Sequence, residues 1–399
     1  MWEGARAWES SPTLPQKALK RSKFWQLLLC LAFACLALLV SVSTATAKST
    51  GGDVRKGLEG LVDSPGGPPG AVATLYKGGH LTTIGVGRAD VTKAGAPKAT
   101  DHMRIASIAK AFSGAVALHL VQEGQLETTA TIGELVGGLP PSWSGVTVAE
   151  LLGHTSGLPD YTESKAFAKH AGSDPRGYVK PRRIIGWVRD EPLNFAAGKQ
   201  YRYSNTDNIV IGLIVEAVTG VSYGEELQRI VFDPAHLTQT SFPSAPRMPQ
   251  PFVHGYLPAT ETEAPQDVSE FLSPSGAWAS GAIVSTPSNL NAFIRADLGL
   301  KFFDRAQQQE QMHWSVGGES SPPGPGKNSA GLALFRYQTK CGTVYGHTGN
   351  FPGYVQFAAG TADGRRAVTT TLNIPAPTGA LLKHLRRVQT TAVCALLGK

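Results

Sequence analysis

The sequence has few cysteines, and none of them stand in a metal-binding pattern. Its four cysteines form no Cys-x-x-Cys, and no His-Glu-x-x-His occurs, so nothing supports a metal site. A Gly-x-Ser-x-Gly motif is also absent, which argues against an α/β-hydrolase. No lysine- or arginine-rich run with interleaved aromatics is present, which argues against nucleic-acid binding. We therefore expect no metal, no cofactor and no nucleic-acid partner.

The net charge is small once the N-terminus is set aside. The chain carries a formal charge of +7, with 42% hydrophobic and 17% charged residues, which is typical of a globular protein. Residues 1–47 hold five lysines or arginines against two glutamates, or +3, which leaves +4 on the remaining residues. Such a balance does not indicate a polyanionic partner.

The N-terminus has the pattern of an export signal. Basic residues precede an apolar run, Phe24–Val40, and the small residues Ala45-Thr46-Ala47 follow it. At about 17 residues the run is short for a membrane-spanning helix. We expect residues 1–47 to be a signal peptide cleaved after Ala47, with a retained anchor as the alternative. The mature chain, residues 48–399, is then secreted, either free or associated with the cell wall, with no further membrane contact.

Two cysteines remain in the mature chain, Cys341 and Cys394. In an oxidising compartment two such residues usually pair, and we predict a disulfide between them. Two buried free thiols are the alternative. The bridge would tie the strand before His347 to a C-terminal helix and close a loop of about 50 residues.

Apolar periodicity predicts strands at both ends of the mature chain. Two apolar runs within residues 71–86 flank a Gly-Gly pair and indicate a β-hairpin. Four alternating runs near the other end predict further strands, at Ala330–Tyr337, Thr343–Gly346, Val355–Ala359 and Ala367–Leu372. The region between them is mostly helical in pattern. We therefore predict an α+β fold, with an antiparallel sheet built from both termini and an inserted all-helical region. The α/β part covers about 48–112 and 282–399, and the helical part about 113–281.

Three short motifs occur in one order: Ser107-Ile108-Ala109-Lys110, Tyr203-Ser204-Asn205 and His347-Thr348-Gly349. Their layout resembles the serine penicillin-recognising enzymes, which carry a Ser-x-x-Lys motif followed by two others. With tyrosine in the second motif, the chain resembles the branch that contains class C β-lactamases and exported D-Ala-D-Ala carboxypeptidases. Histidine in the third, where a β-lactamase usually has lysine, favours the carboxypeptidases. The resemblance runs from about Pro69 to the C-terminus and implies the β-lactamase/penicillin-binding (transpeptidase-like) fold.

The first motif supplies a nucleophile and a base. A serine is a poor nucleophile until a neighbour takes its proton. Ser107 and Lys110 lie at i and i+3 of a helix expected over Ser107–Glu123, which puts both side chains on one face. Lys110 acts as a base only if its pKa falls well below about 10.4, which burial or a nearby cation achieves.

The other motifs are assigned by resemblance. Tyr203 is expected to shuttle a proton between Ser107 and the leaving amine, and Asn205 to hold Lys110 and bind a substrate amide. An unperturbed tyrosine titrates near 10. We therefore expect Lys110 and His347 to supply positive charge around Tyr203.

The resemblance also implies how substrate is bound. The N–H groups of Ser107 and Asn350 are expected to form the oxyanion hole. Gly349 would let an extended substrate approach the strand edge, where a peptide can add as a further strand. Thr348 and a basic residue, for which Arg336 is the candidate, would bind the terminal carboxylate of the substrate.

A further histidine and two departures from the family pattern complete the prediction. His154 lies in a glycine-flanked loop and is interpreted as structural rather than catalytic. Ala197-Gly198 stands where the family usually has Pro-Gly, and Asn350 replaces a small residue or threonine. Neither removes a catalytic group, although Asn350 can narrow the pocket.

The sequence thus predicts an exported, monomeric D-Ala-D-Ala carboxypeptidase that acts on peptidoglycan stem peptides or similar D-amino-acid peptides through a Ser107 acyl-enzyme. β-Lactams are expected to act as covalent inhibitors. Three alternatives stay open. The first is a class C-like β-lactamase. The second is an esterase or D-amino-acid amidase on the same scaffold. The third is a non-catalytic domain that binds wall peptides.

Overall fold

A computed structural model describes residues 51–258, 263–315 and 317–399. The predicted signal peptide, residues 1–47 with cleavage after Ala47, lies outside the described residues. No helix in the described ranges combines the length and the apolar character needed to cross a membrane.

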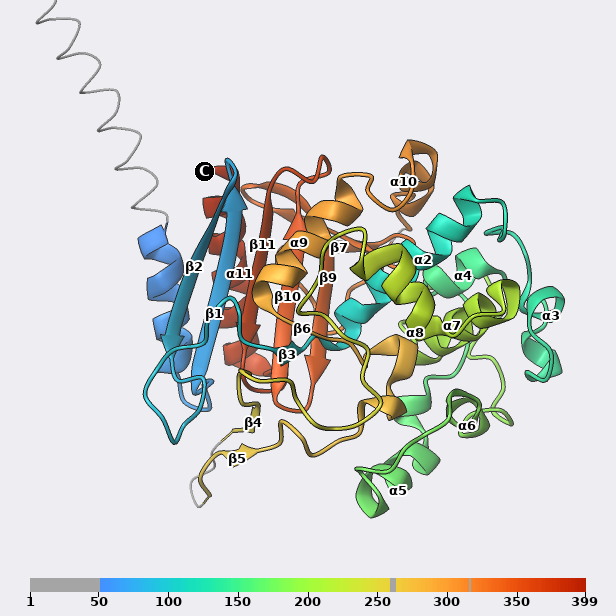
Figure 1. Ribbon diagram of the computed structural model, residues 1–399, viewed down its shortest axis with the longest axis horizontal. Coiled ribbons are helices and arrows are strands. Elements are labelled where there is room, and N and C mark those ends of the chain that lie inside the picture. Colours follow the sequence, from blue (N-terminus) through green and yellow to red (C-terminus); the bar gives the residue numbers. More distant parts are fainter. Residues whose placement is uncertain (1–50, 259–262, 316) are drawn as a thin grey trace, which may run out of the picture. The chain divides into compact units, whose positions relative to one another are not determined.

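The described chain is built around a seven-stranded antiparallel sheet with the order β2-β1-β11-β10-β9-β8-β7 (Figure 1). Its N-terminal strands are β1 (Gly70–Lys77) and β2 (His80–Gly87). Its C-terminal strands are β7 (Lys327–Ala330), β8 (Phe335–Thr339), β9 (Gly342–Phe351), β10 (Tyr354–Gly360) and β11 (Ala367–Leu372). Strands from both ends therefore meet in one sheet, where β1 pairs with β11. This confirms the predicted fold class.

The predicted hairpin is β1 and β2. Gly78 and Gly79 join the strands with φ values of 60° and 84°. Two successive positive φ angles define the tight turn whose twist matches that of the flanking strands, and glycine adopts them without steric cost.

Helices cover both faces of the sheet (Figure 1). A helix over residues 51–62 and α11 (Gly379–Leu397) pack on one face, where Leu58 and Val388 join the sheet residues Val355 and Phe357 in one apolar cluster. On the other face α9 (Pro287–Leu298) contacts β1, β10 and β11. Burial of these apolar stripes is the main force that holds the layers together.

The inserted region lies between two short strands, β3 (Met103–Arg104) and β6 (Val284–Ser285), which pair with each other. Its central helix is α2 (Ala109–Gln122), which is buried along most of its length. The other helices are α3 (Ile132–Leu135), α4 (Val148–Leu152), α5 (Lys165–Ser173), α6 (Pro181–Gly186), α7 (Asn205–Thr219) and α8 (Tyr223–Glu226). Helix α10 (Arg305–Gln311) follows α9.

Short helical turns connect these elements. They are η1 (Ala106–Ile108), η2 (Pro141–Trp143), η3 (Tyr161–Glu163), η5 (Pro274–Gly276) and η6 (Trp278–Ser280), together with the π-helix η4 (Leu227–Phe232). The short strands β4 (Tyr256–Leu257) and β5 (Gln266–Asp267) form a separate pair.

One predicted strand is wrong. The apolar run Ala330–Tyr337 was expected to form a single strand, but it divides into β7 and β8 around a turn. Ala333 has a positive φ of 54°, and its N–H donates to the carbonyl of Leu152 at 2.8 Å. The chain therefore turns at Ala333, where a hydrogen bond to the helical region replaces the pairing that a continuous strand would make.

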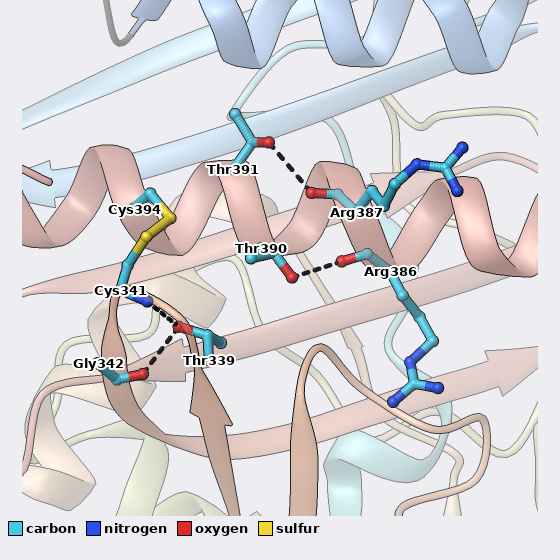
Figure 2. Close-up of a disulfide and its surroundings, with 8 residues drawn as sticks. All are labelled: Thr339, Cys341, Gly342, Arg386, Arg387, Thr390, Thr391 and Cys394. Atoms are coloured by element: carbon cyan, nitrogen blue, oxygen red, sulfur yellow. Dashed lines mark hydrogen bonds between the residues drawn. A yellow bond between two sulfur atoms is a disulfide. The ribbon is translucent and has the colours of Figure 1, made fainter.

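The predicted disulfide is present between Cys341 and Cys394, with a Cα–Cα distance of 5.2 Å (Figure 2). Cys341 lies in the turn between β8 and β9, and its N–H donates to Thr339 Oγ1 at 3.2 Å. Cys394 lies on α11. The bridge ties the strand that carries His347 to the C-terminal helix.

Candidate active site

A strained backbone turn presents Ser107. Ile105 continues from β3, and its N–H donates to the carbonyl of Ile283 at 3.1 Å. The next residue, Ala106, has φ of 53°, a conformation that side-chain-bearing residues rarely adopt. Ser107 then lies in η1, immediately before α2, with its side chain partly exposed to a cavity.

Lys110 is fully buried one turn further along and contacts the nucleophile. Its Nζ donates to Ser107 Oγ at 3.2 Å, to Asn205 Oδ1 at 2.8 Å and to the carbonyl of Ser280 at 2.9 Å. Burial lowers the pKa of Lys110 to about 7, although the negative charge of Asp160 opposes the shift. A substantial fraction of Lys110 is therefore neutral at neutral pH, as a general base requires.

The start of α7 orients Asn205 toward Lys110. The Asn205 side-chain Nδ2 donates to Asp160 Oδ2 at 2.9 Å, and the Asn205 backbone N–H donates to the same oxygen at 3.0 Å. This pairing fixes the amide so that its oxygen faces Lys110. Asp160 lies in the loop after Gly157 and also accepts hydrogen bonds from Thr162.

Tyr203 stands next to both residues. Lys110 Nζ lies 5.0 Å from the centroid of its ring. The phenol oxygen is shielded from solvent and makes no hydrogen bond of normal geometry, but Ser107 is close enough to lower its pKa. Burial outweighs that effect and raises the pKa of Tyr203 well above its usual value of 10. The phenol therefore keeps its proton at neutral pH and is suited to act as an acid.

His347 lies inside strand β9, opposite Ala358 of β10. It is fully buried, and its Nδ1–H donates to the carbonyl of Thr348. Burial, helped by the charge of Lys110, lowers the pKa of His347 to about 3. The imidazole is therefore neutral, and the expectation that it adds positive charge beside Tyr203 is wrong. Its ring centroid lies 6.4 Å from that of Tyr203.

The rest of the third motif packs against the serine turn. A Cβ at Gly349 would stand 2.4 Å from the carbonyl oxygen of Ile105 and 3.2 Å from Ala106 Cβ. The close approach at this glycine is thus made by the protein's own nucleophile turn. Thr348 Oγ1 donates to the carbonyl of Pro322 at 2.7 Å. Asn350 lines the cavity with Ser107.

The cavity beside Ser107 has a volume of about 630 Å³. Its walls include Tyr203 and Asn205 together with apolar side chains, among them Phe167 and Phe351. Arg202 is the only lysine or arginine among the described residues that line it, and it pairs with Glu163 at 2.8 Å. The site is therefore a mostly apolar cavity with a nucleophile and proton-transfer groups at one wall.

Arg336, the predicted carboxylate-binding residue, lies outside this cavity. It is on β8, its Nη2 donates to Ser329 Oγ at 3.3 Å, and its guanidinium stands 5.2 Å from the Trp314 ring centroid. The structure thus brings Ser107, Lys110, Tyr203 and Asn205 together, with His347 behind them, and leaves Arg336 apart.

Sequence reasoning missed Asp160, the carbonyl of Ser280 and Asp207 as parts of the site. Asp160 and Ser280 lie in glycine-flanked loops that carry no periodicity, so only their glycines hinted at a role. Among the described residues no group of three or more histidine, cysteine or acidic side chains is arranged to hold a metal ion.

Two curated relatives match parts of the sequence. Protein flp of Staphylococcus aureus (strain N315) is 32% identical over 180 residues, which cover 44% of this chain and 35% of that protein. Penicillin-binding protein 4* of Bacillus subtilis (strain 168) is 25% identical over 298 residues, 71% of this chain and 63% of the relative. The chain thus aligns with less than two thirds of either relative.

A solved structure and a family model match over a longer span. A D-stereospecific amidohydrolase from Streptomyces sp. superposes with a TM-score of 0.72 at 26% identity, covering 85% of this chain and 98% of the other. The family model described as Beta-lactamase matches residues 58–392. With the Ser107–Lys110 pair and Tyr203 assembled in the corresponding fold, this match shows that the chain belongs to the beta-lactamase family of serine hydrolases and penicillin-binding proteins.

Proposed function

We propose that this chain is an exported serine hydrolase that cleaves an amide bond next to a D-amino acid through an acyl-enzyme on Ser107. The observation that carries the proposal is the contact between Lys110 Nζ and Ser107 Oγ, 3.2 Å, at the wall of the cavity. The disulfide between Cys341 and Cys394 supports export, because such bonds persist in oxidising compartments.

The acylation step uses three side chains. Ser107 Oγ attacks the substrate carbonyl and passes its proton to neutral Lys110, so that an O–C bond forms. Tyr203 gives its proton to the leaving nitrogen as the C–N bond breaks. The proton on Lys110 then returns to Tyr203, so the net transfer is from Ser107 to the departing amine. Water repeats the sequence in place of Ser107 to release the acid.

Strand β9 is the proposed platform for substrate. Its pairing with β8 ends at Gly346, so in the described residues 347–351 pair with β10 alone. An extended peptide can add to such an edge. We assign the oxyanion hole to the N–H groups of Ser107 and Asn350, which both line the cavity. Each such donor contributes roughly 3–4 kcal/mol in other serine hydrolases.

The first candidate substrate is the D-Ala-D-Ala end of a peptidoglycan stem peptide, as the sequence predicted. The similarity to penicillin-binding protein 4* supports it. This candidate requires a group that binds a carboxylate. Arg336 lies away from the cavity and Thr348 already donates to Pro322, so this role stays a prediction for both residues.

A second candidate is a D-amino-acid amide, which has no terminal carboxylate. The charges of the cavity favour this candidate. Arg202 is the only lysine or arginine among the described lining residues, and it is already paired with Glu163, so it is not free to bind a substrate carboxylate. The similarity to a D-stereospecific amidohydrolase agrees with this substrate class.

Intact mass spectrometry after addition of benzylpenicillin tests the nucleophile. We expect one adduct that maps to Ser107 and is absent from Ser107→Ala. A short-lived adduct with product accumulating would instead identify a β-lactamase. Ser107→Ala with full hydrolytic activity would contradict the proposal.

Parallel assays with acetyl-D-Ala-D-Ala and D-alanine amide separate the two substrates. Faster release of D-alanine supports the carboxypeptidase, and faster release of ammonia supports the amidase. The L-enantiomers serve as controls, and equal rates on them would contradict the proposed D-specificity. No turnover and no adduct in folded protein would favour an esterase or a binding domain.

A further inference from the structure

The phenol of Tyr203 depends on packing for its position. Its oxygen is buried, and the hydroxyl group close enough to lower its pKa belongs to Ser107, the nucleophile itself. No hydrogen bond of normal geometry to another residue holds the phenol in place. The ring of His154 lies against it, with ring centroids 4.4 Å apart. His347, the other aromatic neighbour, is 6.4 Å away. Of the two histidine rings that flank Tyr203, His154 is thus the closer.

His154 is itself held rigidly. Its Nδ1 hydrogen-bonds Asp207 Oδ2 at 2.7 Å, and the two side chains are 2% and 0% exposed. The other carboxyl oxygen of Asp207 accepts a hydrogen bond from Ser156 Oγ at 2.5 Å. Asp207 lies in the first turn of α7, the helix that begins with Asn205. The imidazole is therefore anchored to the same helix that holds Asn205 against Lys110.

The backbone of the same loop holds the segment that leads to Tyr203. The carbonyl of His154 accepts from the N–H of Arg202 at 2.9 Å, and that of Thr155 accepts from Gly198 at 2.8 Å. His154 adopts a positive φ of 55°, which turns its carbonyl and its ring toward one segment. A single residue thus contacts both the main chain before Tyr203 and the ring of Tyr203.

His154 and Asp207 do not act on Tyr203 through electric charge. Burial, with a contribution from Lys110, lowers the pKa of His154 to about 3, and burial raises the pKa of Asp207 well above its usual range. Both shifts favour neutral groups. A change at His154 therefore alters the packing around Tyr203 more than the local electric field.

We propose that His154, anchored by Asp207, is a positioning residue that aims the phenol of Tyr203 at the leaving group. This inference rests on the proposed function, in which Tyr203 protonates the departing amine. It assigns a specific role to a histidine that the sequence analysis interpreted as structural.

The proposal predicts a dependence on the leaving group. An amide nitrogen leaves only when it is protonated, whereas p-nitrophenolate leaves without a proton. Misplacement of Tyr203 should therefore slow amide hydrolysis much more than hydrolysis of the p-nitrophenyl ester with the same acyl group. A general loss of folded protein would slow both substrates equally.

His154→Asn tests this, because asparagine tolerates the positive φ but has no ring. We expect the amide kcat/KM, which reports acylation alone, to fall by about 100-fold, the size of a lost proton transfer. The ester kcat/KM should fall by less than about threefold, because p-nitrophenolate needs no proton to leave. Asp207→Ala removes both hydrogen bonds of the anchor, to His154 and to Ser156, and should change the amide-to-ester ratio in the same direction by about tenfold or more. If His154→Asn does not fold, Asp207→Ala decides the question.

His119→Asn is the matched control. His119 lies on α2, away from the cavity lining, and its Nδ1 hydrogen-bonds the carbonyl of Phe302 at 2.6 Å. The ratio of amide to ester hydrolysis rates of the His119→Asn variant should stay at the wild-type value. An unchanged ratio in both test variants, with wild-type enzyme active on both substrates, would overturn the inference alone. Wild-type enzyme that hydrolyses neither substrate would overturn the proposed function and this inference with it.

Discussion

Lys110 shows how its surroundings determine the chemistry of one residue. The Ser-x-x-Lys spacing explains why Lys110 reaches Ser107, since residues three apart share a helix face. Its lowered pKa comes from burial beneath Asn205 and the carbonyl of Ser280, which are 95 and 170 residues away in the chain. The closeness of Lys110 to Ser107 thus follows from local helix geometry, whereas the basicity of Lys110 is set by residues that only the tertiary structure brings near it.

The rate of Ser107 acylation should rise with pH through about 7, because Lys110 accepts a proton only in its neutral form. Asp160 raises the pKa of Lys110, so Asp160→Asn should lower it further and move the acid limb to lower pH by about one unit. Acylation by benzylpenicillin, followed from about pH 5 to 9, measures this limb.

Asp63→Asn, at an exposed position in the N-terminal part of the described chain, is the control and should leave the limb unchanged. A shift of the Asp160→Asn limb to higher pH, or a flat profile in the wild type, would contradict the assignment of Lys110 as the base.

The contact between β9 and η1 joins the nucleophile turn to the sheet. Gly349 allows it, because any side chain there would meet the Ile105 carbonyl oxygen at 2.4 Å. Ala106 in η1 already has a strained backbone. The position of Ser107 is thus set by an element whose Gly349 lies 242 residues further along the sequence.

Gly349→Ala should push β9 away from η1 and slow acylation of Ser107 by about 100-fold, the effect of a shift near 1 Å. The rate of adduct formation with benzylpenicillin measures this loss. Gly145→Ala is the matched control, because a Cβ at Gly145 meets nothing within 4 Å. Wild-type acylation in Gly349→Ala would show that the contact does not position Ser107.

The disulfide links two elements, the β8–β9 turn and α11. Its partners are 53 residues apart, and by the loop-entropy model such a bridge contributes roughly 4 kcal/mol to the free energy of unfolding. A Cys341→Ser, Cys394→Ser double variant should lose about that much in urea unfolding. Its kcat should stay within about twofold of wild type, because neither residue lines the cavity.

Reduction of the wild-type disulfide provides the check on this prediction, since reduced wild type and the double variant should unfold at the same urea concentration. Equal stability of oxidised and reduced wild type would show that the bridge adds nothing to the fold.

At the scale of the whole described molecule, the buried cation Arg104 links distant segments of the chain. Arg104 is 1% exposed, its Nε donates to the carbonyl of Ser269 at 3.1 Å, and its Nη2 donates to that of Pro246 at 2.6 Å. These bonds tie the segment between η4 and η5 to strand β3. Leu272, in the same segment, lines the cavity. The side chains of Met248, Val253 and Tyr256 in this segment are also buried.

Arg104→Met should lower the free energy of unfolding by about 2–4 kcal/mol, because it leaves the buried carbonyl of Ser269 and the part-buried carbonyl of Pro246 without donors. It should also slow acylation, since the wall of the cavity loses its anchor. Urea unfolding and benzylpenicillin acylation give the two readings. Arg88→Met removes an exposed side chain and is the control, and an Arg104→Met variant as stable as that control would contradict this role.

Local patterns in the sequence predicted much of the architecture. The Gly78-Gly79 pair predicted the first hairpin, and apolar alternation predicted β11 at Ala367–Leu372. Such patterns work because side chains alternate in a strand and repeat every 3.6 residues in a helix. They failed at Ala333, where a hydrogen bond to Leu152 turns the chain.

The amino-acid sequence by itself determined the family, the fold class, the single cysteine pair that can form a disulfide in the mature chain, and the candidate groups Ser107, Lys110 and Tyr203. The spacing of residues and their chemical types are written in the chain, and those features needed nothing more. Tertiary structure alone decided that His347 is buried and neutral, that Arg336 lies away from the cavity, and that His154 packs on Tyr203. The physical reason is that desolvation and packing depend on atoms brought together from distant parts of the chain.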